Sequence, residues 1–448
     1  MTGKKNEQKG RKFSVDVTSL VGGQFLIALI SLVNSIVVAK ALGVEDRGYF
    51  LMAAMLPNIL FTFSDFGLGH ASTKFVASKK WLASTVFVSN TIVICIRLFV
   101  IGIVGCVVVH FYSENFFPGI PKTYLYLGLL QSIALVIQGS IFPIFLGLGY
   151  GVRYSLILVA SSVLSLITLS VGWLTVGLSV NLALVLQFGS SLVVAIYIYF
   201  TVLKHIGELG KTSKQYLVEA FRFGSGIYLS IISTFANQKM VLIVLNFYGG
   251  VVFVSLYTIA QALSERMYLL ADAVGTILMP KVAEDPKVNS SMYTPLVFKL
   301  TILVVTFFSI LLMFVSEWLV TFVYGSDFSA SGVIIRVLLL AGIFLSGWRV
   351  LSQDLIAKGM TKKTAFVDVV MVVTSLGASI LLLPTMGLLG AAWGAVVGAV
   401  LSIALGWWFY MQKGTDHDGV PNSLVTFSKQ EMRTIKLALD SISPFKKY

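Results

Sequence analysis

Long uninterrupted apolar runs dominate this chain of 448 residues. The first of them extends from Leu20 to Ala39, about the twenty residues that an α-helix needs to cross the hydrocarbon core of a bilayer. Because no water reaches that core, a chain that spans it must satisfy its backbone polar groups within helices or closed barrels. The runs are too long and too little alternating for barrel strands. The sequence therefore predicts an all-α integral membrane protein.

Composition also indicates that lipid is the main solvent. Hydrophobic residues make up 57% of the chain and charged residues 12%, whereas soluble domains carry about 25% charged residues. The mean hydropathy is +0.89. A net charge of +13 would suggest nucleic acid as a partner of a soluble protein, but here the basic residues lie between apolar runs, where membrane topology explains them. We therefore expect no nucleic-acid partner.

The apolar runs predict about twelve transmembrane helices in two lobes of six. The predicted divisions are an N-terminal tail (1–17), a first lobe (18–204), a linker (205–222), a second lobe (223–411) and a C-terminal tail (412–448). A short internal match supports two related halves. Asp65-Phe-Gly-Leu-Gly near the end of the second run is followed by Lys74, and Asp272-Ala-Val-Gly in the eighth is followed at the same spacing by Lys281. An even number of spans in each half predicts a parallel pseudo-repeat.

Lys and Arg are distributed unevenly between the connections. Most of the 33 fall in the N-terminal tail, in the connections after even-numbered spans and in the C-terminal tail, whereas Lys40, Arg47 and Lys122 lie on the opposite side. The positive-inside rule then places both termini in the cytoplasm of a multi-pass inner (plasma) membrane protein. In the linker, a helix-like pattern that includes Tyr216 and Phe221 predicts an interfacial helix.

Several local motifs resemble one known family across nearly the whole chain. They are Ala41-Leu-Gly-Val-Glu-Asp-Arg-Gly-Tyr49, Asp65-Phe-Gly-Leu-Gly69, Tyr257-Thr-Ile-Ala260, Val323-Tyr-Gly-Ser-Asp-Phe328, Ala357-Lys-Gly-Met360 and Gly387-Leu-Leu-Gly-Ala-Ala392. In these the sequence resembles the Wzx-type polysaccharide flippases, which handle units of O-antigen and related oligosaccharides. Their superfamily also contains multidrug and toxin extrusion transporters and lipid II flippases.

The resemblance implies two six-helix lobes around a central cavity. It implies alternating access that moves an oligosaccharide on a polyprenyl pyrophosphate carrier from the cytoplasmic to the outer leaflet, for lipopolysaccharide, exopolysaccharide or another surface polysaccharide. The implied partners are this lipid-linked oligosaccharide, the bilayer, and a polymerase or other glycan assembly proteins. No cofactor is implied.

Charged side chains inside the predicted spans are the candidate site residues, because such groups normally face protein or a wet cavity. The candidate cations for an anionic pyrophosphate are Arg97, Lys239, Arg266 and Arg349. The candidate carboxylates for ion coupling or charge compensation are Glu265, Asp272 and Asp354. Each has a structural alternative, in which it balances another charge or caps a backbone carbonyl of a neighbouring helix.

Two other functions are weighed against the flippase. A cation-coupled multidrug extrusion antiporter of the same fold would need carboxylates deep in a lobe, but the first half has Asp65 near a span end and Arg97 deeper. A membrane enzyme of glycan assembly would need acid, base or metal groups in an outer loop. The longest outer connection, 113–123, carries few charged groups, and the sequence shows no metal-ligand spacing and no phosphate-binding loop. We expect no catalytic residue and no metal.

Overall fold

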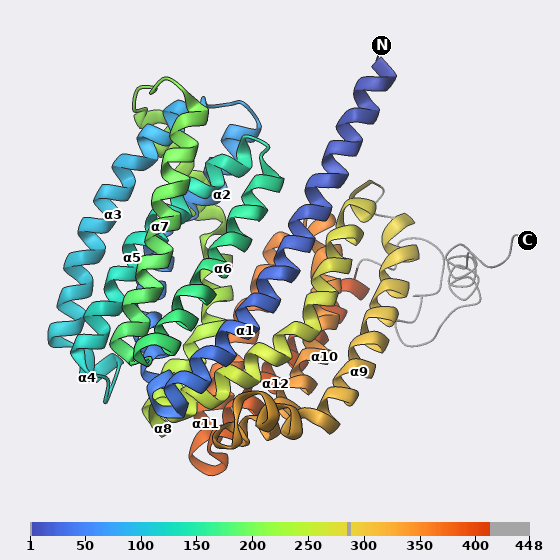
Figure 1. The fold of residues 1–448 in the computed structure, drawn as a ribbon. Helices are drawn as coiled ribbons and strands as arrows, with labels where there is room; N and C mark the ends of the chain where they lie inside the picture. The colour runs from blue at the N-terminus through green and yellow to red at the C-terminus, as the bar shows by residue number, and fades with distance from the viewer. Residues whose placement is uncertain (1, 285–287, 413–448) are drawn as a thin grey trace, which may run out of the picture. The chain divides into compact units, whose positions relative to one another are not determined.

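The computed structural model describes the backbone of residues 2–284 and 288–412, and the side chains of residues 22–267 and 293–412. Within this part of the chain every regular element is a helix (Figure 1), which confirms the all-α prediction. The elements are α1 (Thr2–Asp65), α2 (Leu68–Ala77), α3 (Ala83–Phe111), α4 (Ser113–Phe116), α5 (Lys122–Gly147), α6 (Gly151–Val176), α7 (Val180–Ile206), α8 (Lys214–Glu284), α9 (Val288–Tyr324), η1 (Ser326–Phe328), α10 (Ala330–Ala357), α11 (Thr361–Met386) and α12 (Leu388–Met411). The predicted tail after Gln412 and the side chain of Asp272 lie outside the described residues.

Two of the helices are kinked and long enough to cross a bilayer twice. The described residues contain 10 helices with the length and hydropathy of membrane spans, and the segments Gly22–Asp65 and Lys214–Met267 hold 44 and 54 residues. Gly43 in α1 and Gly250 in α8 have φ angles of 77° and 64°, a left-handed conformation that glycine adopts without steric cost. Counting each kinked helix as two spans gives the twelve crossings that hydropathy predicts.

The described chain forms two compact units. The first contains residues 1–259 and 320–331, and the second contains residues 260–319 and those from 332 onward. The first unit therefore includes the part of α8 up to Ile259. The division into two six-helix lobes, joined by a linker at residues 205–222, stays a prediction.

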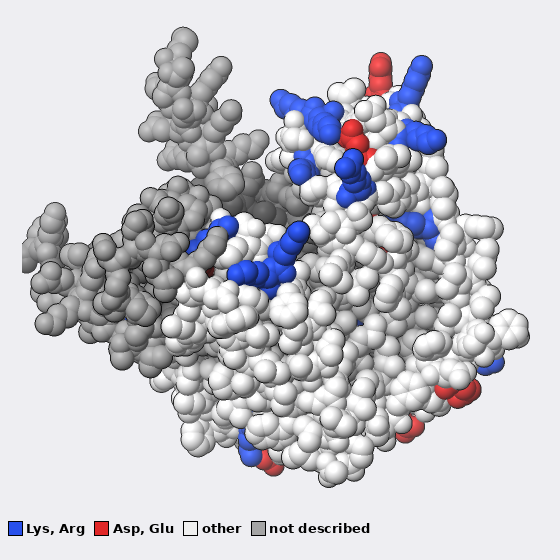
Figure 2. Space-filling view, turned by 180° about the vertical axis from the view of Figure 1, so that it is seen from behind, with Lys and Arg blue, Asp and Glu red and all other residues white. Residues whose placement is uncertain are grey.

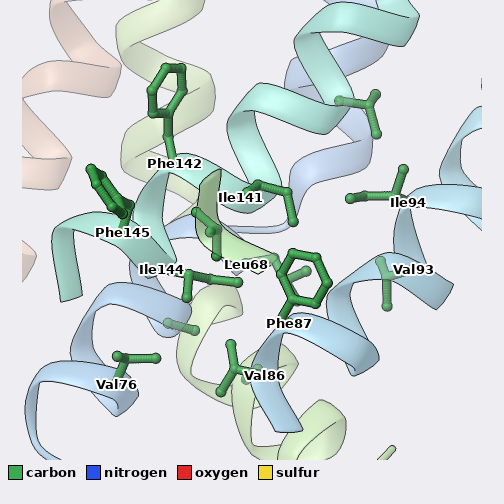
Figure 3. Close-up of a cluster of buried hydrophobic side chains, with 14 of the residues drawn as sticks. Leu68, Val76, Val86, Phe87, Val93, Ile94, Ile141, Phe142, Ile144 and Phe145 are labelled. Carbon is green, nitrogen blue, oxygen red and sulfur yellow. The ribbon is translucent and has the colours of Figure 1, made fainter. Parts of the chain in front are cut away.

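Apolar side chains of α2, α3 and α5, with others from α7 and α8, form one buried cluster of the first unit (Figure 3). Leu68, Phe87, Ile141, Ile144 and Phe145 are almost completely buried there. Lipid tails are as apolar as these side chains, so the association of the helices depends on close packing rather than on escape from water. The cluster fixes α2, α3 and α5 against one another.

A glycine stripe joins α11 to α12 in the second unit. Gly387 alone separates the two helices, and Gly390, Gly394 and Gly398 follow at intervals of one helical turn. A methyl group at any of these three positions would collide with atoms of α11. The missing side chains let the two backbones approach closely, as in other membrane helix pairs with small residues at the interface.

Charged side chains gather toward the helix ends and leave an apolar flank. Figure 2 shows this pattern on the face in view. Exposed basic residues at one end of the first unit include Lys74, Lys79, Lys80, Lys211 and Lys214. Large apolar side chains are exposed along the helices, among them Phe99, Ile167 and Val193. Exposed apolar surface of this extent fits a protein surrounded by lipid.

Candidate functional site

A buried ion pair lies inside the first unit. Arg97 of α3 places its NH1 atom 3.1 Å from Oδ1 of Asp65, and the two side chains are 6% and 11% exposed. Two charges that are removed together from water keep their ionised forms only if each finds partners in the protein. The remaining contacts of this pair therefore decide what Arg97 can do.

The pair sits where α1 ends. The chain leaves the helix after Asp65 through Phe66 and Gly67, whose φ angles are 47° and 71°. The last carbonyl groups of a helix lack partners within the helix, and side chains donate to carbonyl groups near this end. Arg97 NH2 donates to the carbonyl of Phe61 at 3.3 Å, and the hydroxyl of Tyr228 donates to the carbonyl of Phe63 at 2.7 Å. A cation at a helix C-terminus also interacts favourably with the helix dipole.

The other donors of Arg97 are also engaged within this unit. Nε and NH2 contact the hydroxyl of Ser64 at 3.3 and 3.2 Å, and NH1 donates to the hydroxyl of Ser140 at 3.2 Å. The sequence left Arg97 open between a ligand contact and a structural cation. With its donors held by Asp65, Ser64, Ser140 and a backbone carbonyl, the geometry favours the structural role.

A polar network continues from the ion pair to the start of α8. Asn90 donates to the carbonyl of Ser140 at 3.1 Å and to the hydroxyl of Ser72 at 3.0 Å, and it accepts a hydrogen bond from Tyr216 at 3.0 Å. Tyr216 is 0% exposed. The sequence predicted an interfacial helix for this segment without assigning the surroundings of Tyr216, and the structure buries this side chain in protein. A tyrosine buries its hydroxyl only where it finds such partners.

Lys239 differs from Arg97 in its surroundings. It lies in α8, eleven residues before the kink at Gly250, which is about 16 Å along a helix. Its side chain is exposed, and no ion pair or hydrogen bond of its ammonium group is present among the described residues. A lysine near the middle of a span cannot stably face lipid tails.

The second unit holds a separate ion pair. Lys358 Nζ lies 2.6 Å from Oδ2 of Asp354, which is 0% exposed. The hydroxyl of Thr294 donates to the other carboxylate oxygen at 2.7 Å. This carboxylate is held by two partners, which is the charge compensation that its spacing from Lys358 suggests.

The remaining candidate residues also belong to the second unit. Glu265 accepts a hydrogen bond from Gln261, one turn earlier in α8, at 2.9 Å. Arg266 and Arg349 are partly buried. Arg349 lies next to Trp348 in α10. The indole N–H of Trp348 donates a hydrogen bond to Asp368 at 3.0 Å. Among the residues whose side chains are described, no three His, Cys, Asp or Glu groups are placed to hold a metal ion.

Sequence reasoning did not single out Arg47 as a buried charge. The residue was assigned to an outer connection, yet the structure makes it 3% exposed. The position of Arg47 in the sequence could have identified it. It is one of few basic residues on the side of the membrane where the positive-inside rule predicts almost no Lys or Arg. A cation retained against that bias is a candidate for a specific role.

Comparisons with known proteins agree on family and fold. The sequence profile of a family described as "Polysaccharide biosynthesis protein" matches residues 14–283. No curated protein matches the chain. The structure is similar to lipid II flippase MurJ in its inward closed conformation, with a TM-score of 0.73, 16% identity and coverage of 94% of this chain and 98% of that one.

Two further solved structures extend this likeness. A multidrug resistance MATE family transporter of the MOP superfamily, in an inward-facing conformation, gives a TM-score of 0.67 at 16% identity and covers 87% of this chain and 94% of its own. A MOP superfamily transporter from Pyrococcus furiosus, described as having a binding pocket of reverse polarity, gives 0.61 at 16% identity, with coverage of 90% and 95%. At these identities the likeness shows the fold, which is that of membrane transporters.

Proposed function

The chain belongs to the polysaccharide biosynthesis protein family, and we propose that it is a flippase for oligosaccharides linked to a polyprenyl pyrophosphate. It moves this substrate from the cytoplasmic to the outer leaflet of the plasma membrane by alternating access. Both of its termini are cytoplasmic, and its product passes to a polymerase or other glycan assembly proteins.

One observation carries the proposal, namely the exposed ammonium group of Lys239 within a membrane span. Because a lone cation cannot stably face lipid there, it requires a water-filled or ligand-filled space. A fixed cation in such a space favours an anionic substrate. At about 4 Å, one pair of unit charges is worth roughly 4 kcal/mol at an effective dielectric constant of 20.

Two further cations predicted from the sequence, Arg266 and Arg349, stay candidate contacts for a pyrophosphate. Both lie within spans of the second unit, and a pyrophosphate offers enough oxygens for several cations. Arginine binds phosphate oxygens in a bidentate manner, whereas lysine acts as a compact charge. We assign Arg97 to the structure of the first lobe instead, because its donors are already engaged.

The carboxylates favour a flippase over an antiporter. A transporter of cationic drugs needs ionised carboxylates that are accessible to its cargo. Asp65 is held by Arg97, and Asp354 is held by Lys358 and Thr294. Because these two carboxylates are engaged, they favour an anionic cargo over a cationic one.

Charge substitutions at Lys239 test the proposal. In Lys239→Gln we expect lipid-linked oligosaccharide to accumulate on the cytoplasmic leaflet, and export of surface glycan to fall at least about tenfold, as when a charge-assisted contact is lost. Lys239→Arg should keep partial export because it keeps the charge. Export is measured per amount of folded protein in the membrane.

Lys214→Gln is the matched control, since it makes the same change in the same helix at its exposed beginning. It should export normally. Near-normal export by Lys239→Gln would remove the basis of the proposed site. Lipid-linked oligosaccharide that reached the outer leaflet unpolymerised would instead support an enzyme of glycan assembly.

A further inference from the structure

Hydrogen bonds of Arg47 connect two helices at one end of the first unit. It lies in α1, four residues after the kink at Gly43. NH1 donates to the carbonyl of Ser255 at 2.7 Å, to its hydroxyl at 3.1 Å and to the hydroxyl of Thr258 at 3.1 Å, and NH2 donates to the hydroxyl of Ser35 at 3.2 Å. A single guanidinium group thus connects the first kinked helix to the second.

The partners of Arg47 are all neutral. No carboxylate is paired with this residue in the part of the chain that the structure describes. Hydrogen bonds replace its hydration, but no opposite charge compensates for its burial. Water can take the place of each neutral partner, and the guanidinium recovers its hydration when it is exposed. Such a contact opens more easily than an ion pair.

The contact joins segments from the two predicted halves of the chain. Arg47 comes from the first half, whereas Ser255 and Thr258 come from the second. The backbones also touch here, since a methyl group at Gly48 would collide with the backbone carbonyl of Val251. At this point the two kinked helices are in direct backbone contact.

We infer that Arg47 is a releasable latch that keeps this end of the molecule closed. The inference rests on the proposed flippase function, because alternating access requires the halves to separate at each end in turn. In the closed state, Arg47 lies among hydroxyl and carbonyl groups. Opening returns it to water, where a passing pyrophosphate would find an additional cation.

A buried cysteine reports on the latch without any substrate. Cys95 and Cys106 are both exposed, so they are first replaced by alanine, and Val251, which is buried beside Gly48, is then replaced by cysteine. Purified protein is treated with a charged maleimide. We expect slow labelling with Arg47 present and at least about tenfold faster labelling in Arg47→Met, as one lost charge-assisted hydrogen bond predicts. Arg47→Lys should be intermediate.

Controls separate opening from loss of structure. A cysteine at the exposed Asn115 should label at the same rate in all variants, and Arg336→Met should leave the labelling of Val251→Cys unchanged. If Arg47→Met fails to fold, Thr258→Val removes one acceptor while keeping the shape. Equal labelling of Val251→Cys with and without the latch contacts would overturn the inference, as would an equal acceleration in a variant elsewhere in the fold that lowers the melting temperature by the same amount. Neither result depends on glycan export, so the proposed function is tested separately.

Discussion

Two buried arginines of the first unit are held in opposite ways. Arg97 faces the carboxylate of Asp65 and the end of α1, whereas Arg47 contacts only neutral oxygens among the residues the structure describes. Removing one member of a buried ion pair strands the other charge, but no charge among the described residues is paired with Arg47. A carboxylate partner fixes a buried cation, whereas water can replace neutral partners, so we expect the loss of each arginine to have a different effect.

The strongest test of this difference breaks the ion pair. Arg97→Met leaves Asp65 ionised and buried, which should cost about 3 to 5 kcal/mol and leave little folded protein. The double variant Asp65→Asn/Arg97→Gln removes both charges and should recover most of the loss. Heat-challenge melting of the purified proteins in one detergent measures both. A single variant as stable as the unaltered protein would show that the pair is not essential to the fold.

Removing the uncompensated arginine should have a smaller effect on stability. Arg47→Met leaves neutral acceptors without a donor and strands no charge, so we expect a loss of about 1 to 2 kcal/mol in the same melting assay. A loss as large as that of Arg97→Met would mean that Arg47 is structural, and the contrast between the two arginines would disappear.

Of the three arginines, the one at the surface should contribute least to stability. Arg336 pairs with Glu317 at 3.0 Å, but its side chain is 43% exposed. Solvent screens such pairs, so Arg336→Met should change stability by no more than about 0.5 kcal/mol. A larger loss would indicate that this pair is shielded by lipid, and the exposed fraction would then be a poor guide to the cost of removing a charge.

Hydropathy was sufficient to predict the all-helical fold and the number of spans. Each apolar run satisfies its own backbone hydrogen bonds, so it can be recognised without knowledge of its neighbours. The pair of Asp354 and Lys358 was also predictable, because the residues lie one helical turn apart.

The partners that distinguish the arginines were not predictable. Arg97 and Asp65 lie on different helices, as do Arg47 and Ser255, and nothing in a single sequence specifies which helices will touch. The burial of Tyr216 was missed for a related reason. An amphipathic pattern shows that one face of a helix avoids water, but lipid and protein both satisfy that face.

The glycine stripe between α11 and α12 has a consequence for the synthesis of the chain. A single residue joins the two helices, and their backbones fit without intervening side chains. They are therefore able to leave the insertion machinery as a preassembled hairpin. A bulkier residue at Gly394 would then act during biogenesis, by sending the unfinished protein to degradation, before any cargo is moved.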